Sequence, residues 1–120
     1  MSETSGGEGR ADHRELLGRL EHIAPALPFP LTSRPMFGGT MAYADGRPFA
    51  SLSSAGLAVK LPAGDQRRLL DERGGRRLRH APDQPESKQY IVLPRRIVDD
   101  DDALAEWVGL SGRHAMGGRR

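Results

Sequence analysis

The chain has 120 residues, of which 37% are hydrophobic and 28% charged, and this composition is typical of one soluble globular domain. Its 18 basic and 16 acidic residues leave a net charge of only +2, and nearly all the basic residues are arginine. The absence of cysteine excludes disulfides, zinc–thiolate sites, iron–sulfur clusters and cysteine nucleophiles.

The two ends of the chain differ from its middle. Residues 1–11 are polar and rich in Gly, Ser and Glu, so we expect a disordered tail there. We expect a second, frayed tail at residues 113–120 and a single domain over residues 12–112. No apolar run is long enough for a secretory signal or a membrane span, so we expect no membrane association and a cytoplasmic location.

The first predicted element is a helix. Asp12 can cap it, and Glu15 stands three residues later in the capping-box position. Helical spacing then joins four apolar residues into one stripe, Leu16, Leu17, Leu20 and Ile23. Three prolines end the helix and favour an extended connection, Pro25, Pro28 and Pro30.

A run of strands follows. We predict short strands at 34–37, 40–44, 47–53 and 57–61, with a bend or bulge at Gly38-Gly39. Asp45-Gly46 between two extended runs is a strong signal for a two-residue hairpin, because both turn positions favour a positive φ. Pro48 lacks an N–H and should therefore lie where no ladder partner is needed.

The second half predicts a short helix, two strands and a last helix. The short helix covers about 65–73, with Asp65 as its N-cap and Gly74-Gly75 as its stop. Strands are expected at 76–80 and 88–93, and the last helix begins within the acidic run 99–102. Its buried stripe should comprise Leu104, Trp107, Val108 and Leu110. This order predicts the α+β class with a mainly antiparallel sheet.

Several of these residues form a pattern that resembles the N-terminal domain of the TfoX/Sxy family. The likeness extends from about residue 15 to residue 110, and the Met-Phe-Gly-Gly block is specific only together with the later positions. The residues that carry it are Met36, Phe37, Gly38, Gly39, Tyr43, Asp45, Gly46, Phe49, Ala50, Leu57, Lys60, Tyr90, Leu93, Pro94 and Trp107.

The resemblance implies a layered, secretion-chaperone-like α+β domain that often forms a homodimer. Two-domain members regulate natural competence together with a cyclic-AMP-responsive transcription activator, and they carry a second, helical domain that we do not expect in this chain. The family implies no catalytic residue, so the motif residues are expected to be structural or to form a partner surface.

Individual motif residues allow two interpretations each. Gly38-Gly39 fits a bulge or turn better than an anion-binding nest, and Met36 and Phe37 fit half-buried core positions better than a partner surface. We expect Tyr43, Phe49 and Tyr90 in the sheet core rather than as platforms on which nucleic-acid bases stack, because no basic residues interleave with them as in an RNA-binding sheet. Lys60 is expected at a strand end with its ammonium group in solvent.

Metal and cofactor sites are not expected. The four histidines have no metal-ligand spacing, and they are His13, His22, His80 and His114. The acidic run 99–102 lacks the glycine and terminal glutamate of an EF-hand, so we interpret it as a solvated helix start. Serines 51, 53 and 54 lack a nucleophile-elbow context.

One cluster of arginines could face a partner. Six lie within thirteen residues, Arg67, Arg68, Arg73, Arg76, Arg77 and Arg79, and they could form a patch for phosphate or for an acidic partner. The alternative is an ordinary surface neutralised by Asp71, Glu72 and the run 99–102.

The leading hypothesis is a non-enzymatic protein that acts through protein–protein contacts with an unidentified partner, as a homodimer, in transcriptional or competence-type regulation. The alternative is a weak nucleic-acid-binding accessory protein that uses the arginine cluster. A third alternative is an enzyme of unrecognised type.

Overall fold

The computed structural model describes residues 13–36, 38–79 and 83–117, so the expected N-terminal tail, Phe37 and His80 lie outside the described residues. A six-stranded antiparallel sheet has the strand order β1-β2-β3-β4-β6-β5. The strands are β1 Leu31–Met36, β2 Gly39–Ala44, β3 Arg47–Ser53, β4 Gly56–Lys60, β5 Arg76–Arg77 and β6 Tyr90–Val92. The helices are α1 His13–Ile23, α2 Ala63–Glu72, α3 Arg95–Val98 and α4 Asp101–Ala115, with a 3₁₀ turn at Ala24–Ala26. The α+β class is confirmed.

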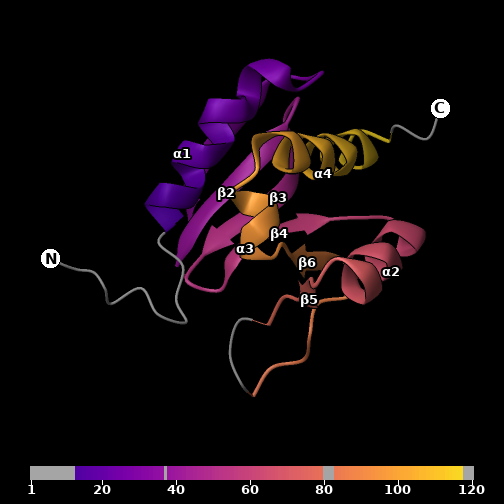
Figure 1. Cartoon of the computed structure of the whole chain (residues 1–120). Helices are drawn as coiled ribbons and strands as arrows, with labels where there is room; N and C mark the ends of the chain where they lie inside the picture. The colour runs from indigo at the N-terminus through magenta and orange to yellow at the C-terminus, as the bar shows by residue number, and fades with distance from the viewer. Residues whose placement is uncertain (1–12, 37, 80–82, 118–120) are drawn as a thin grey trace, which may run out of the picture.

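Strands β1 to β4 form a meander of tight hairpins (Figure 1). Asp45 and Gly46 have φ values of 50° and 82°, which confirms the predicted two-residue turn. Gly38, with φ of 85°, lies in the β1–β2 turn, which confirms the bend expected at the glycine pair. Pro48 lies at a bulge in the β2–β3 register. The residues of β3 that pair with β4 begin at Ala50, so the missing N–H of Pro48 removes no hydrogen bond to β4.

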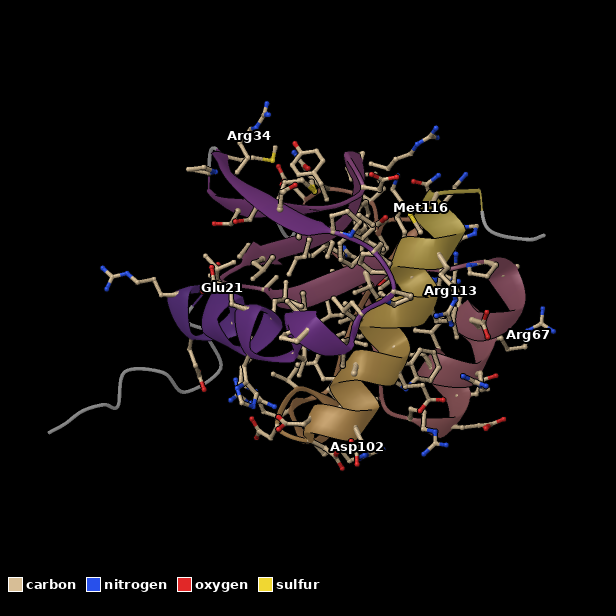
Figure 2. The ribbon with its side chains drawn as sticks, turned by 90° about the horizontal axis from the view of Figure 1, so that it is seen from above. Glu21, Arg34, Arg67, Asp102, Arg113 and Met116 are labelled. Carbon is tan, nitrogen blue, oxygen red and sulfur yellow. The ribbon has the colours of Figure 1, made fainter. Side chains whose placement is uncertain are left out.

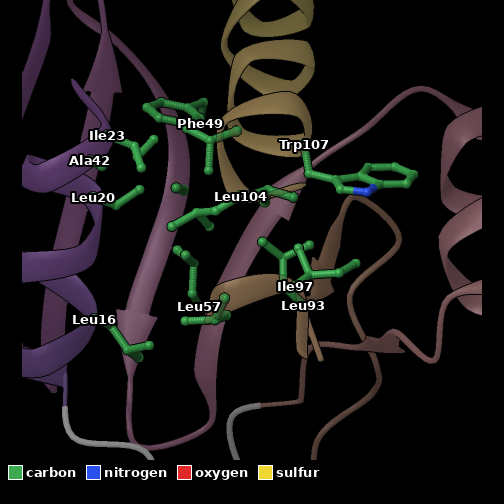
Figure 3. Close-up of a cluster of buried hydrophobic side chains, with 14 of the residues drawn as sticks. Leu16, Leu20, Ile23, Ala42, Phe49, Leu57, Leu93, Ile97, Leu104 and Trp107 are labelled. Carbon is green, nitrogen blue, oxygen red and sulfur yellow. The ribbon is translucent and has the colours of Figure 1, made fainter. Parts of the chain in front are cut away.

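The helices cover one face of this sheet, and the hydrophobic core lies between the helices and that face. Leu16, Leu20 and Ile23 of α1 are buried, as the predicted stripe requires, and Leu17 packs partly against them. Leu104 and Trp107 of α4 pack into the same core (Figure 3). Trp107 is only 3% exposed and points toward α2, which confirms that the single tryptophan is buried.

Phe49 links the sheet to α4. It is fully buried, and its ring meets Phe29 edge to face, with centroids 5.7 Å apart. The backbone carbonyl of Phe49 accepts a hydrogen bond from the buried Ser111 hydroxyl of α4 at 3.3 Å. Gly112, one residue further along α4, leaves the space that the Phe29 ring occupies. These contacts fix the position of α4 on the sheet.

Ion pairs join α1 to the start of α4. Arg19 donates from Nε to the Val98 carbonyl at 3.0 Å and pairs with Asp101 at 2.6 Å, and His22 Nε2 lies 3.1 Å from the same carboxylate. Arg95 bridges Glu15 and Asp99 at 2.8 and 2.7 Å. The acidic run therefore has two roles. Asp100 caps α4 by accepting hydrogen bonds from the first amides of that helix, and Asp101 anchors α1 through Arg19 and His22.

Several boundaries differ from the sequence prediction. Pro62, not Asp65, occupies the N-cap of α2, and no side chain caps that helix. Strands β5 and β6 are shorter than predicted, and the short helix α3 was missed because a Pro94 N-cap looks like a simple strand stop. Helix α4 continues to Ala115, past the domain boundary expected at residue 112, because its last turn still packs on the core.

Within the described residues, each helix is too short or too polar to pass through a lipid bilayer.

Candidate functional site

The sheet has one face without helices, which we call the open face. The strand register places the side chains of Arg34, Met41 and Ser51 on it, side by side across β1, β2 and β3. The burial of β2 alternates accordingly: Ala42 and Ala44 are buried beneath the helices, whereas Met41 and Tyr43 are half-buried on the open face. Figure 2 places Arg34 on the opposite side of the sheet from Glu21 and Asp102 of the helical layer.

A second row of the open face brings together residues that are distant in sequence. Lys60 of β4 is the register partner of Tyr90 of β6, and its Nζ lies 5.9 Å from the centre of the tyrosine ring. Arg34 lies 5.6 Å from the centre of the Tyr43 ring. Both distances fit cation–π contacts. The predicted core position holds for Phe49, whereas Tyr43 and Tyr90 are half-buried on the open face, where strand pairing brings basic residues beside them that are distant in the sequence.

Tyr90 is held firmly on this face. Its hydroxyl donates to the Met41 Sδ at 4.0 Å, and its backbone amide donates to the Ser87 hydroxyl at 2.9 Å. Burial, assisted by the nearby Tyr43, raises the pKa of the Tyr90 phenol above its ordinary value. The phenol consequently stays protonated and acts as a hydrogen-bond donor at neutral pH.

A groove of about 490 Å³ opens on this face beside Tyr90. Its walls include Met36, Met41, Ser51, Ser53, Leu78 and Tyr90, and the Gly38-Gly39 pair lies at its β1–β2 end. Met36 is 49% exposed, so the expected half-buried core position is corrected: its side chain lines the groove instead of the core. A small apolar cluster of Ala58, Leu78 and Val92 closes the open face on the β4–β6 side.

Charge separates the two faces. None of the six strands contains Asp or Glu, and their charged residues are Arg34, Arg47, Lys60, Arg76 and Arg77. Arg34, Lys60 and Arg76 share the open face by register. The carboxylates of the described chain belong to helices, turns and loops, as with Glu15, Asp99 and Asp101. The charged side chains that the strands place on the open face are thus all cationic, and they have apolar and aromatic neighbours.

The family-pattern residues fall into two groups. Met36, Gly38, Gly39, Tyr43, Lys60 and Tyr90 lie on or beside the open face. Others that the structure describes are structural: Asp45-Gly46 forms the hairpin turn, Phe49 lies in the core, and Pro94 is the N-cap of α3. Sequence reasoning missed Arg34, Met41 and the serines as members of the surface, although their alternation with buried Ala42, Ala50 and Leu52 was a usable signal.

The arginine cluster does not form one continuous patch. Arg68 stacks on the Trp107 ring at 4.6 Å, and Arg77 donates to Gln66 at 2.9 Å on the helical side. Arg76 donates to the Ala55 carbonyl at the rim of the groove, and Arg79 pairs with Glu86. Arg67 and Arg73 are exposed. The six side chains therefore point to different surroundings, although their sequence positions are adjacent.

The histidines do not converge in the described chain. His22 pairs with Asp101, and His114 is exposed near the end of α4. No group of three or more metal-ligating side chains occurs among the residues that the structure describes.

Comparison with known proteins identifies the family of the chain. The model of the TfoX N-terminal domain matches residues 23–115, from the end of α1 to the end of α4. No curated protein and no solved structure matches the chain. The matched segment holds all six strands, the open face and the groove. The chain therefore belongs to the TfoX N-terminal domain family.

Proposed function

We propose that this protein acts by binding another protein through the open face of its sheet, in regulation of the transcriptional or competence type, and not by catalysis. The observation that carries the proposal is a groove lined by Met36, Met41 and Tyr90, on a face that also carries Tyr43 and Lys60. A half-uncovered sheet face with an exposed methionine and half-buried tyrosines is characteristic of an interaction surface.

The surface combines the properties that protein contacts need. Met36 and Met41 supply flexible apolar contact, and Tyr43 and Tyr90 supply rigid aromatic area with a polar tip. Arg34 and Lys60 are held against the tyrosine rings, so less side-chain entropy is lost when a partner binds.

Site-specific photocrosslinking in the cells of origin tests the proposal. A photoreactive phenylalanine at Ser51 lies on the open face, whereas the matched control at Glu106 lies on an exposed position of α4. We expect a discrete crosslinked protein from position 51 that position 106 does not give. Identical products from both positions, or none from position 51, would refute the proposal.

We further propose that the protein is a homodimer, as the family likeness suggests. Strand β1 supports this, since it is an edge strand whose side chains from Thr32 to Met36 are all exposed. Sedimentation equilibrium measures the mass directly. A monomer at cellular concentration would contradict this part of the proposal while leaving the open-face contact intact.

The alternative function, weak nucleic-acid binding through the arginine cluster, has less geometric support. Arg68, Arg77 and Arg79 each hold an intramolecular contact that phosphate would have to displace, and Arg76 lies on the opposite face of the sheet from Arg77. It stays a prediction that a salt titration of DNA and RNA binding can decide, because phosphate contacts weaken steeply with salt.

A further inference from the structure

We propose that the open-face groove binds an extended acidic segment of the partner, with one apolar side chain in the groove between two carboxylates. This inference rests on the proposed function and deepens it, since it specifies the chemistry of the bound segment.

The charge of the face determines the sign of the partner. Arg34 stands on β1, Lys60 on β4, and the Arg76 guanidinium reaches the Ala55 carbonyl at the groove rim, 2.9 Å away. The strands contribute no carboxylate that could neutralise these cations. A basic segment would be repelled, whereas carboxylates on a partner would pair with guanidinium and ammonium groups at the rim.

The groove beside those cations suits an apolar side chain. Met36, Met41 and Leu78 provide its apolar walls, and thioethers adapt to aliphatic groups of different shape. Ser51 and Ser53 add hydroxyls that can bond the backbone of a bound segment. The volume of about 490 Å³ is ample for one large aliphatic or aromatic side chain with its flanking backbone.

Strand geometry sets the spacing of the carboxylates. Three strand intervals separate β1 from β4, about 14 Å at roughly 4.8 Å per interval, and Lys60 lies two residues beyond Ala58, the β4 residue in the row of Arg34, so about 16 Å separates the two Cα atoms. An extended segment advances about 3.3 Å per residue, so four residues cover about 13 Å, and the long Arg34 and Lys60 side chains reach the rest. Since alternate side chains of an extended chain share one side, acids at positions i and i+4 and an apolar residue at i+2 would all face the sheet.

Two other occupants fit less well. A second copy of this chain, related by a two-fold axis through the open face, would bring Arg34 and Lys60 toward like charges. Single-stranded nucleic acid needs free aromatic rings for stacking, but the Tyr43 and Tyr90 rings already carry Arg34 and Lys60. The carboxylates of an acidic peptide can pair with the sides of the Arg34 guanidinium and the Lys60 ammonium that face away from the tyrosine rings.

A selection from random displayed peptides tests the inference without a known partner. The full-length protein serves as bait, and a charge-reversed variant, Arg34→Glu with Lys60→Glu, removes peptides that bind elsewhere. We expect the enriched peptides to carry Asp or Glu at i and i+4 around an apolar residue at i+2. Enrichment without an excess of acids, or failure to enrich any peptide dependent on Arg34 and Lys60, would overturn the inference.

The enriched peptide then gives a quantitative measurement. Its affinity should fall about three- to tenfold for the milder variant Arg34→Gln with Lys60→Gln, and further with added salt. Arg67→Gln with Arg73→Gln is the matched control, since it removes two exposed positive charges from the α2 side and should leave the affinity unchanged. Circular dichroism of each variant establishes that the fold is retained.

The outcomes separate this inference from the proposed function. A crosslinked partner at Ser51 together with non-acidic selected peptides keeps the open face as a binding surface but refutes its preference for acidic segments. Oligothymidylate that displaces the selected peptide and binds more tightly would identify a nucleic-acid surface and refute both.

Discussion

The two faces of the sheet contrast in packing and charge. The helical face buries Leu20, Phe49 and Leu104 completely, and its acidic side chains pair with arginines at the helix ends. The open face leaves Met36 exposed and Tyr43 and Tyr90 half-buried, with cations as its only charges from the strands. One face therefore provides the stability of the domain, and the other leaves apolar, aromatic and cationic side chains without a covering layer.

The largest expected effect is on the helical face. Trp107→Ala removes a buried ring that packs against the core and carries Arg68 on its surface, so it should cost roughly 3–5 kcal/mol of unfolding free energy. Urea denaturation followed by circular dichroism measures it. A cost below about 1 kcal/mol would mean that α2 does not cover this ring in solution and that the helical face is less closed than described.

Gly112→Ala should give the next largest effect. An added methyl group on α4 would strike the Phe29 ring, which is itself locked edge to face against Phe49. Overpacking of this kind costs about 1–3 kcal/mol. The matched control is Gly64→Ala in α2, where no atom would meet the new methyl group and stability should stay equal or rise. Equal losses at both positions would contradict the tight seam between α4 and Phe29.

The ion pairs of the helical face predict a pH dependence. Hydrogen bonds from Arg19 and His22 hold the pKa of Asp101 below its ordinary value of 3.8. Because the folded carboxyl releases its proton more readily than the unfolded one, its stabilising contribution is present above about pH 4 and is lost as pH falls through the folded pKa. Wild-type protein should exceed Asp101→Asn in urea midpoint at neutral pH, and the gap should close on acidification.

Asp102→Asn is the control for that titration. It removes a carboxylate from the same helical turn without touching Arg19 or His22. The gap between wild type and this variant should be smaller and should close less on acidification. If both variants lose the same amount with the same pH profile, the general charge at the start of α4 is responsible and the specific pairing with Arg19 is not.

Sequence reasoning was most successful where one short segment contains the whole signal. Asp45-Gly46 forms its turn because two adjacent residues favour positive φ, and the stripe of α1 follows from helical spacing alone. The pairing of Lys60 with Tyr90 could not be predicted, because it exists only since β6 inserts between β4 and β5. The separation of Arg76 from Arg77 is different, because the strand predicted at 76–80 already implies that adjacent side chains lie on opposite faces of the sheet.

The smallest effect on stability should come from the open face. Met36→Ala removes an exposed side chain from the groove wall and should change the unfolding free energy by no more than about 0.5 kcal/mol. The same truncation of a buried methionine would cost about 2–5 kcal/mol. Binding should respond differently, since loss of the thioether widens the groove and reduces contact with the apolar residue of the bound segment. Parallel denaturation and peptide titration of Met36→Ala measure both quantities on one sample. A stability loss of several kcal/mol would mean that Met36 is buried, for example in a dimer, whereas unchanged stability with weakened binding is the result that assigns this face to a partner.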